Sequence, residues 1–348
     1  MSDFPHLSER MNRIDSSEVR RVFQLAAKLE NPINLSIGQP HYPAPPEIQE
    51  AIIAALSAGH TAYTQTQGIP ELRERMARKY AAQNGFQAHP DNILISSGVS
   101  SLIQLLFLAT LDPGDEVLIS DPCFLIYRSM LNFFNARVTT FPENFSPDDI
   151  EPIKKSIQNK KIKLIIFCTP SNPTGHVMSA EQLRMLGEIA DGCGAYLVSD
   201  EIYELFDYDN GFHSTASIYP RTLTLSGFSK SYSMTGLRLS AATGPEEIIR
   251  AMTTLQQYTV VCAPSAVQWA GIRALDLDMK DYVQAYKQNR DYCVQRLKGR
   301  TRFTQPAGAF YIFPEVPGTD REFVERAIQT RQLLIVPGRI FTERTNHV

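Results

Sequence analysis

Several features that would place a protein in other classes are missing from this sequence. No apolar run is long enough to span a bilayer, which takes about 20 residues in a helix. The five cysteines stand singly, form no CxxC pair and are odd in number, so we expect reduced, mostly buried thiols and not a disulfide framework. No GxGxxG motif follows a predicted strand, which argues against a nicotinamide-dependent dehydrogenase.

A strong charge of one sign is missing as well. The 34 basic and 37 acidic residues leave a formal net charge of -3, which gives no reason to expect nucleic acid or an anionic membrane as a partner. The segment Met1–His6 lacks the basic and apolar blocks of a signal peptide, so we expect a cytoplasmic protein. The 348 residues, 43% of them hydrophobic and 20% charged, predict one large globular domain, or one large and one small.

Strands and helices alternate through the middle of the chain. Several strand candidates are short, nearly continuous apolar runs such as Leu164–Phe167, a pattern typical of strands covered on both faces. The alternation predicts an α/β fold, a mostly parallel seven-stranded sheet with helices on both faces, and its site should lie at the carboxyl ends of strands. The predicted strands are Asn92–Ser96, Glu116–Ser120, Arg137–Phe141, Lys163–Thr169, Ala195–Ser199, Thr222–Leu225 and Leu239–Thr243, and the helices between them are Ser100–Leu111, Cys123–Phe134, Ser146–Gln158 and Ser179–Asp191.

The two ends of the chain predict a second, smaller α+β domain. We expect residues 1–45 to form an N-terminal arm and part of that domain, 46–275 the large domain, and 276–348 the rest of the small one. A helix is predicted over Ser16–Glu30, and the proline-rich link Gly38–Pro46 should be extended, because proline blocks a helix. Later helices are predicted over Glu246–Tyr258, Ala266–Ala274 and Asp278–Lys298, followed by an αβ segment at Ala309–Phe313, Arg321–Thr330 and Leu333–Val336.

The most informative segment is Leu225–Arg238. A β-rich run, Thr222–Leu225, leads into a small-residue turn that presents Lys230, and Arg238 follows eight residues later. A lysine presented in this way can form an imine with an aldehyde, and a nearby arginine can hold a phosphate. Pyridoxal 5'-phosphate (PLP) carries both groups. Most lysines are solvated surface charges. The interpretation of Lys230 as a cofactor-binding residue therefore depends on support from the rest of the chain.

Four other predicted strand ends carry polar or aromatic groups. Ser96–Ser101 opens a helix whose amides favour an anion, although a serine-rich helix cap is the simpler interpretation. The turn Pro170–Gly175 can aim the Asn172 amide at a ligand oxygen, or be only a turn. Asp200 can pair with a protonated pyridine nitrogen or cap a helix, and Phe124 can stack on a flat ring or belong to the core.

Taken in order, these segments resemble the class I and II aminotransferases, which are PLP-dependent enzymes of fold type I (aspartate/aromatic aminotransferase-like). The resemblance covers essentially the whole chain, and the ordered set is specific although no single block is. The matching blocks are Asn34–Gly38, Ala62–Gly68, Asp112–Asp115, Ser171–Gly175, Ser199–Tyr203, Lys230–Arg238 and Gly308–Tyr311.

The resemblance implies a role for each matched position. Lys230 would hold PLP as an aldimine and then move the proton between Cα and C4'. Asp200 would keep the pyridine nitrogen protonated, and Tyr203 and Asn172 would bond the ring 3'-oxygen. The remaining implied roles are phosphate binding by Gly98, Val99, Ser100, Ser229 and Arg238, ring stacking by Phe124, phosphate contact across a homodimer interface by Tyr63, and a place in the substrate site for Gly38 and Asn172.

The sequence departs from the family at the carboxylate clamp. Relatives carry near the C-terminus an arginine that binds the substrate α-carboxylate at both oxygens, whereas this sequence stops at Val348, before that position. We expect a missing tail, and we expect Arg339 and Arg344 to be surface or loop charges and not substitutes. Leu237 stands where tryptophan is more usual, and Cys123 should be a packing residue and not a nucleophile.

Three functions remain open from the residues. An aminotransferase would move an amino group from an L-amino acid to a 2-oxo acid by a ping-pong mechanism. A PLP-dependent C–S lyase or related synthase would share Lys230 and Asp200, and a non-catalytic PLP-binding module is supported only by the absent clamp. The resemblance favours an aminotransferase of amino acid metabolism and biosynthesis, with aspartate or aromatic donors, 2-oxoglutarate as acceptor, and no metal.

Overall fold

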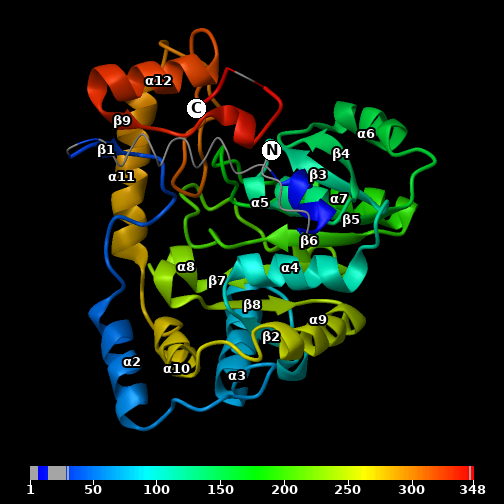
Figure 1. Ribbon diagram of the computed structural model, residues 1–348, viewed down its shortest axis with the longest axis vertical. Helices are drawn as coiled ribbons and strands as arrows, with labels where there is room; N and C mark the ends of the chain where they lie inside the picture. The colour runs from blue at the N-terminus through cyan, green and yellow to red at the C-terminus, as the bar shows by residue number, and fades with distance from the viewer. Residues whose placement is uncertain (1–6, 15–28, 30, 345) are drawn as a thin grey trace.

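A seven-stranded sheet forms the centre of the molecule, as the computed structural model shows (Figure 1). The structure describes residues 7–14, 29, 31–344 and 346–348. Apart from Leu29, the predicted helix Ser16–Glu30 lies outside the described residues. The strands are β2 (Ile93–Ser96), β3 (Glu116–Asp121), β4 (Arg137–Pro142), β5 (Ile162–Cys168), β6 (Tyr196–Asp200), β7 (Thr222–Gly227) and β8 (Ser240–Thr243).

The order of the strands is β2-β8-β7-β6-β5-β3-β4. All neighbouring pairs from β7 to β4 are parallel, whereas β8 runs antiparallel to both β2 and β7. The seven predicted strands and the mostly parallel sheet are therefore confirmed. Because the parallel strands share one direction, the segments that follow β3, β5, β6 and β7 leave the sheet at the same edge.

Each face of the sheet is covered by its own set of helices. Along β5, Leu164 and Ile166 pack into one hydrophobic core with helices α4, α5 and α9, while Ile165 and Phe167 pack into a second core with α6 and α7. Both sets of side chains are buried, which is the reason for the continuous apolar run. The covering helices are α4 (Val99–Thr110), α5 (Leu125–Phe133), α6 (Ile150–Ser156), α7 (Ala180–Cys193) and α9 (Glu246–Thr259).

The helix α7 shows why these helices begin and end where they do. Ser179 accepts a hydrogen bond from the backbone of Gln182, whose side chain bonds back to the Ser179 amide, so the two form a capping box at its start. Gly194 ends the helix in the left-handed conformation at φ 73°, which glycine adopts without steric cost. The sequence-based prediction of this helix is confirmed to within two residues.

A third core lies beyond β2 and β8. It gathers Ile93, Ile95 and Ala241 from these strands under the helices α2 (Pro46–Ser57), α3 (Pro70–Lys79) and α10 (Ser265–Ala274). The sequence analysis did not predict α2 and α3. Both begin with proline at their first position, where its fixed φ suits a helix start and no amide hydrogen bond is lost.

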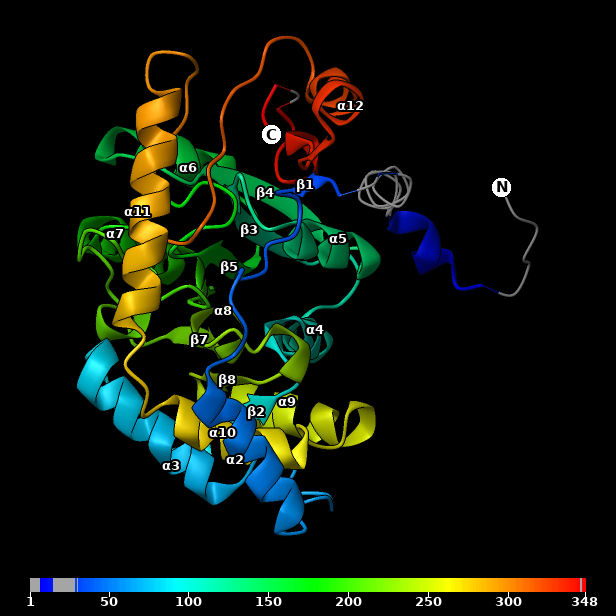
Figure 2. The same cartoon turned by 90° about the vertical axis from the view of Figure 1, so that its left-hand side faces the viewer.

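The two ends of the chain meet on the other side of the molecule, near the top of Figures 1 and 2. Strand β1 (Ile33–Asn34) pairs in parallel with β9 (Leu333–Leu334), which packs against α12 (Asp320–Arg331). The long helix α11 (Lys280–Leu297) follows α10 in the chain. The segment Ala309–Phe313 forms no regular strand. Short pieces complete the described chain: α8 (Phe228–Ser231), η1 (Glu9–Arg13), η2 (Tyr80–Asn84), η3 (Pro90–Asn92), η4 (Pro147–Asp149), η5 (Thr215–Ser217), η6 (Thr235–Leu237) and η7 (Gly338–Ile340).

No helix among the described residues is both long enough and apolar enough to cross a membrane. The division of the chain at residues 45 and 275 remains a prediction. It is supported by the meeting of β1 with β9, which brings the first and last segments into one unit.

Candidate active site

Lys230 lies in α8, directly after β7, and its amine is largely buried. Its Nζ donates a hydrogen bond to the carbonyl oxygen of Gly38. Burial first, and the Arg238 charge second, lower the pKa of Lys230 to about 8, while Asp200 opposes them. A lysine with this pKa is neutral, and therefore nucleophilic, about 300 times more often near pH 7 than one with the ordinary pKa of 10.5.

Asp200 is the last residue of β6, and only 3% of it is exposed. Its carboxylate accepts hydrogen bonds from the Tyr127 hydroxyl at 2.6 Å and from the Ile202 amide at 3.2 Å. Burial raises the pKa of Asp200 to about 6, although both bonds and the Lys230 charge lower it. A carboxyl held at this depth gains strongly from a cationic partner such as a pyridinium.

Tyr127 is a site residue that the sequence analysis missed. It is fully buried on α5, and its ring lies edge-on to Phe124, with 6.0 Å between the ring centroids. Phe124 itself stands at the start of α5, partly buried against the first core. A tyrosine three residues after Phe124 is typical of ordinary core packing. Nothing in the sequence therefore indicated that Tyr127 would hydrogen-bond to Asp200.

Three polar side chains converge beside Lys230 and Gly38. The Asn172 amide donates to the Tyr203 hydroxyl at 3.5 Å, and that hydroxyl lies 2.6 Å from the hydroxyl of Tyr311. The Asn172 side-chain oxygen is buried, and no group within the described part of the chain hydrogen-bonds to it. An unsatisfied buried amide of this kind is costly unless a further group binds there.

Gly98 and Arg238 form a cradle suited to an anion. Gly98 precedes α4 at φ 89°, and a Cβ at this position would overlap the Arg238 guanidinium. Arg238 donates to the Thr235 carbonyl at 2.9 Å and lies over the first turn of α4. The guanidinium and the free amides at the helix start together favour a phosphate-sized anion.

The remaining predicted residues fall in two groups. Val99 and Ser229 are buried beside the cradle and beside Lys230, whereas Ser100 is exposed on the first turn of α4. Tyr63 is 83% exposed, so it faces away from the interior of its own chain. The structure thus brings most of the predicted residues to one sheet edge and leaves Tyr63 at the surface.

Glu143 supports the Asn172 turn from behind and was also missed. It follows β4, is 4% exposed, and accepts hydrogen bonds from the hydroxyls of Ser171 and Thr174. Burial raises the pKa of Glu143 to about 7, against the effect of both hydroxyls. The two bonds fix the turn on either side of Asn172.

Two further expectations concern cysteine and arginine. Burial raises the pKa of Cys123 to about 12, and a thiol of this kind is inert, as expected for a packing residue. Arg339 is bonded to both oxygens of the buried Asp320 in α12 at 2.9 and 3.0 Å, and Arg344 is exposed. Both arginines therefore lie in the terminal segments as structural or surface charges.

The fold is that of fold-type I PLP-dependent enzymes. The family of class I and II aminotransferases matches residues 30–348. The chain belongs to this family, and it is an aminotransferase.

Several known proteins are similar to this chain. A probable aspartate aminotransferase of Methanocaldococcus jannaschii is 37% identical over 97% of this chain and 92% of its own. Aromatic-amino-acid aminotransferase 2 of Thermococcus litoralis is 33% identical over 96% of this chain and 90% of its own. The structure of a single mutant of Thermus thermophilus aspartate aminotransferase superposes with a TM-score of 0.92, at 31% identity over 98% of this chain and 94% of that one.

Proposed function

We propose that the chain binds PLP through Lys230 and, as a homodimer in the cytoplasm, transfers amino groups from aspartate or an aromatic amino acid to 2-oxoglutarate. The observation that carries the proposal is the position of Lys230, a buried amine with a pKa of about 8 that lies between a buried carboxylate and an anion cradle. The PLP aldehyde, pyridine nitrogen and phosphate are complementary to these three groups.

The residues fit the cofactor on two further observations. The absence of a side chain at Gly98 lets the Arg238 guanidinium approach the start of α4, where its charge suits a phosphate, and the buried side-chain oxygen of Asn172, which has no partner among the described residues, suits a hydrogen-bond donor on a bound group. When bound, PLP supplies a ring that accepts the electron pair left on Cα as its proton departs. Phe124 would cover one face of that ring.

Each protein group has a separate task in this proposal. Lys230 would hold the cofactor at its aldehyde carbon, and its amine would take up the proton that leaves the substrate Cα. The Asp200 carboxylate holds the proton on the pyridine nitrogen, and Tyr203 donates its hydroxyl proton to the ring oxygen. Arg238 and the amides after Gly98 bind the phosphate.

The substrates and the partner rest on similarity. The relatives are named aspartate and aromatic aminotransferases, which supports these donors and does not favour the lyase or the non-catalytic module. The exposed Tyr63 supports a second subunit, because a tyrosine that faces away from its own site can complete the site of a partner.

One experiment tests the proposal. The visible absorption spectrum of the purified protein is recorded with PLP, and single amino acids are then added. We expect a yellow band that bleaches with the donors, recovers with 2-oxoglutarate, and is absent from the Lys230→Ala variant. A band that never bleaches would contradict the transfer reaction, and no band at all would contradict PLP binding.

A further inference from the structure

Tyr311 reaches the site from a part of the chain that is distant in sequence. Its hydroxyl lies 2.6 Å from the Tyr203 hydroxyl, next to Gly38. A Cβ on Gly38 would overlap the Tyr311 hydroxyl and come within 3.2 Å of its ring carbons. The absence of a side chain at Gly38, whose carbonyl accepts from Lys230, is therefore what leaves room for Tyr311.

The backbone before Tyr311 is fastened to the other parts of the site. The amides of Ala307 and Gly308 both donate to the Gly175 carbonyl at 2.9 Å, at the end of the turn that carries Asn172. The Ala309 amide donates to the Phe206 carbonyl at 2.8 Å, three residues after Tyr203. The segment Pro306–Tyr311 thus bridges the Asn172 turn and the Tyr203 segment.

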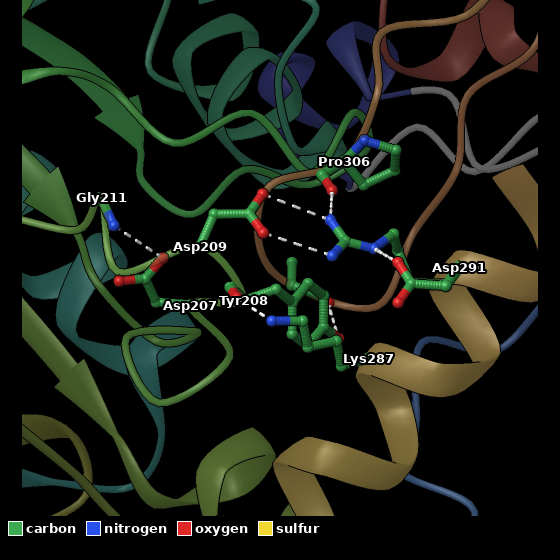
Figure 3. Close-up of polar contacts among 9 residues, drawn as sticks. Asp207, Tyr208, Asp209, Gly211, Lys287, Asp291 and Pro306 are labelled. Carbon is green, nitrogen blue, oxygen red and sulfur yellow. Dashed lines mark hydrogen bonds and ion pairs between the residues drawn. The ribbon is translucent and has the colours of Figure 1, made fainter.

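The helix α11 holds the same segment from the outside, as Figure 3 shows. Arg290 donates to the Pro306 carbonyl and to Asp209 and Asp291, and its guanidinium lies 4.9 Å from the centroid of the Tyr208 ring.

Tyr208 contacts both Arg290 and the segment Pro306–Tyr311. Its hydroxyl donates to the Ala309 carbonyl, and the Lys287 amine donates to the Tyr208 carbonyl at 2.7 Å. The side chain of Arg290 is 8% exposed, so its charge is directed into this contact and not into solvent. The backbone that leads into Tyr311 is consequently held at Pro306 by α11 and at Ala309 by Tyr208.

We propose that Tyr311 is a positioning residue that donates a hydrogen bond to the Tyr203 hydroxyl and thereby aims the single proton of Tyr203 at the cofactor ring oxygen. The inference rests on the proposed function. Burial raises the pKa of both tyrosines, so each keeps its proton near neutral pH. If Tyr203 gives its proton to the ring, its oxygen is left to accept, and of the two donors beside it Tyr311 at 2.6 Å is closer than the Asn172 amide at 3.5 Å.

The direction of the effect follows from charge. A donor at the ring oxygen stabilises that oxygen most when the nearby Lys230 nitrogen has lost its proton, since the negative charge is then uncompensated. The donor therefore lowers the pH at which this nitrogen loses its proton. Removal of the Tyr311 hydroxyl weakens the hydrogen bond from Tyr203 to the ring oxygen. The pH at which the Lys230 nitrogen loses its proton should then rise by about 0.5–1 unit, which corresponds to the free energy of one hydrogen bond.

The test is a pH titration of the visible band of the PLP-loaded protein without substrate. We expect the midpoint of Tyr311→Phe to lie about 0.5–1 unit above that of the natural protein. Tyr286→Phe is the matched control, because Tyr286 lies in the same aromatic cluster but its hydroxyl bonds to His41 and not to Tyr203. An unchanged midpoint in Tyr311→Phe, or an equal shift in Tyr286→Phe, would overturn the inference.

A second variant separates positioning from general damage. Gly38→Ala should displace the Tyr311 hydroxyl and raise the midpoint, and the same substitution should have a smaller effect in the Tyr311→Phe background. Equal effects in both backgrounds would contradict the coupling. If the natural protein develops no band with PLP, the proposed function fails together with this inference, whereas a normal band without these shifts overturns the inference alone.

Discussion

Burial moves the protonation of the two central residues in opposite directions. It raises the pKa of the Asp200 carboxyl to about 6 and lowers that of the Lys230 amine to about 8, because both charged forms lose hydration. The Tyr127 hydroxyl counteracts this effect at Asp200 through its bond of 2.6 Å. Each residue can therefore change its charge near neutral pH when a ligand arrives.

Loss of the Asp200 carboxylate should remove the partner of the pyridine nitrogen. We expect Asp200→Ala to lower kcat by at least about a hundredfold, as measured in a coupled transamination assay. Tyr127→Phe keeps the carboxylate and removes one charge-assisted hydrogen bond, so its loss should be about tenfold. A near-normal rate in Asp200→Ala would exclude the proposed role of this residue.

The depressed pKa of Lys230 should be visible in the kinetics of cofactor loading. Only the neutral amine attacks an aldehyde. We expect the rate at which the visible band forms to rise about tenfold per pH unit below pH 8 and to level off above it. Stopped-flow mixing of cofactor-free protein with PLP measures this rate, and a rate that still rises steeply up to about pH 10 would indicate an ordinary exposed lysine.

Most of the candidate site residues could be predicted from local sequence because each lies at the end of a strand or shortly after it. Lys230, Asp200, Asn172 and Gly98 stand at chain positions where an apolar run gives way to a small or polar residue. Tyr311 lies in the matching block Gly308–Tyr311, but it follows no strand, and its contact with the Tyr203 hydroxyl joins segments more than 100 residues apart. Long-range hydroxyl pairs of this kind leave no local pattern.

At the scale of elements, the Asn172 turn depends on the end of β4. Glu143 holds the turn by accepting from Ser171 and Thr174. Its pKa of about 7 lies above the usual value, so its contribution to the free energy of unfolding is fully present below about pH 4.5 and is lost as the pH rises through 7. The protonated acid, which avoids a buried charge, is the more stable form.

A neutral amide at this position should flatten the pH dependence. We expect the free energy of unfolding of Glu143→Gln to differ between about pH 5 and about pH 8 by some 1–3 kcal/mol less than that of the natural protein, as measured by urea unfolding. Glu188→Gln, at an exposed position of α7, should leave the difference unchanged. The prediction fails if the two variants behave alike.

The helices and strands could be predicted where their side chains are buried in the same way along the whole element. Strands such as β5 are buried on both faces and show it as unbroken apolar runs. The helix α2 was missed because its first residue, Pro46, belongs to the proline run that predicted an extended link, although proline at a first helical position favours the start. The helix α3, which begins at Pro70, was not predicted either. The segment Ala309–Phe313 forms no regular strand because Ala309 has φ 53° and the Ala307 and Gly308 amides bond to a turn.

At the scale of the whole molecule, Tyr63 is exposed at the surface of its own chain. If it binds the phosphate of a partner subunit, Tyr63→Ala should weaken PLP binding about tenfold, as measured by titration of the visible band. Tyr292→Ala, which alters another exposed tyrosine (62%) on α11, is the control and should not weaken binding.

Subunit mixing tests whether Tyr63 acts across an interface. A hybrid of Lys230→Ala and Tyr63→Ala subunits contains one site in which both natural residues are present. At PLP concentrations that do not saturate Tyr63→Ala, unfolding and refolding the two together should restore up to about a quarter of the natural activity. No recovery above the sum of the separate variants would contradict a shared site.

The parallel pair β1–β9 also has a consequence for the time course of synthesis. Ile33 leaves the ribosome about 300 residues before Leu333, its partner in the sheet. At about 5–20 residues per second, the first strand waits tens of seconds, while the seven strands between them can already assemble. The pair β1–β9 therefore closes after the central strands have formed, and the speed of translation limits when it can do so.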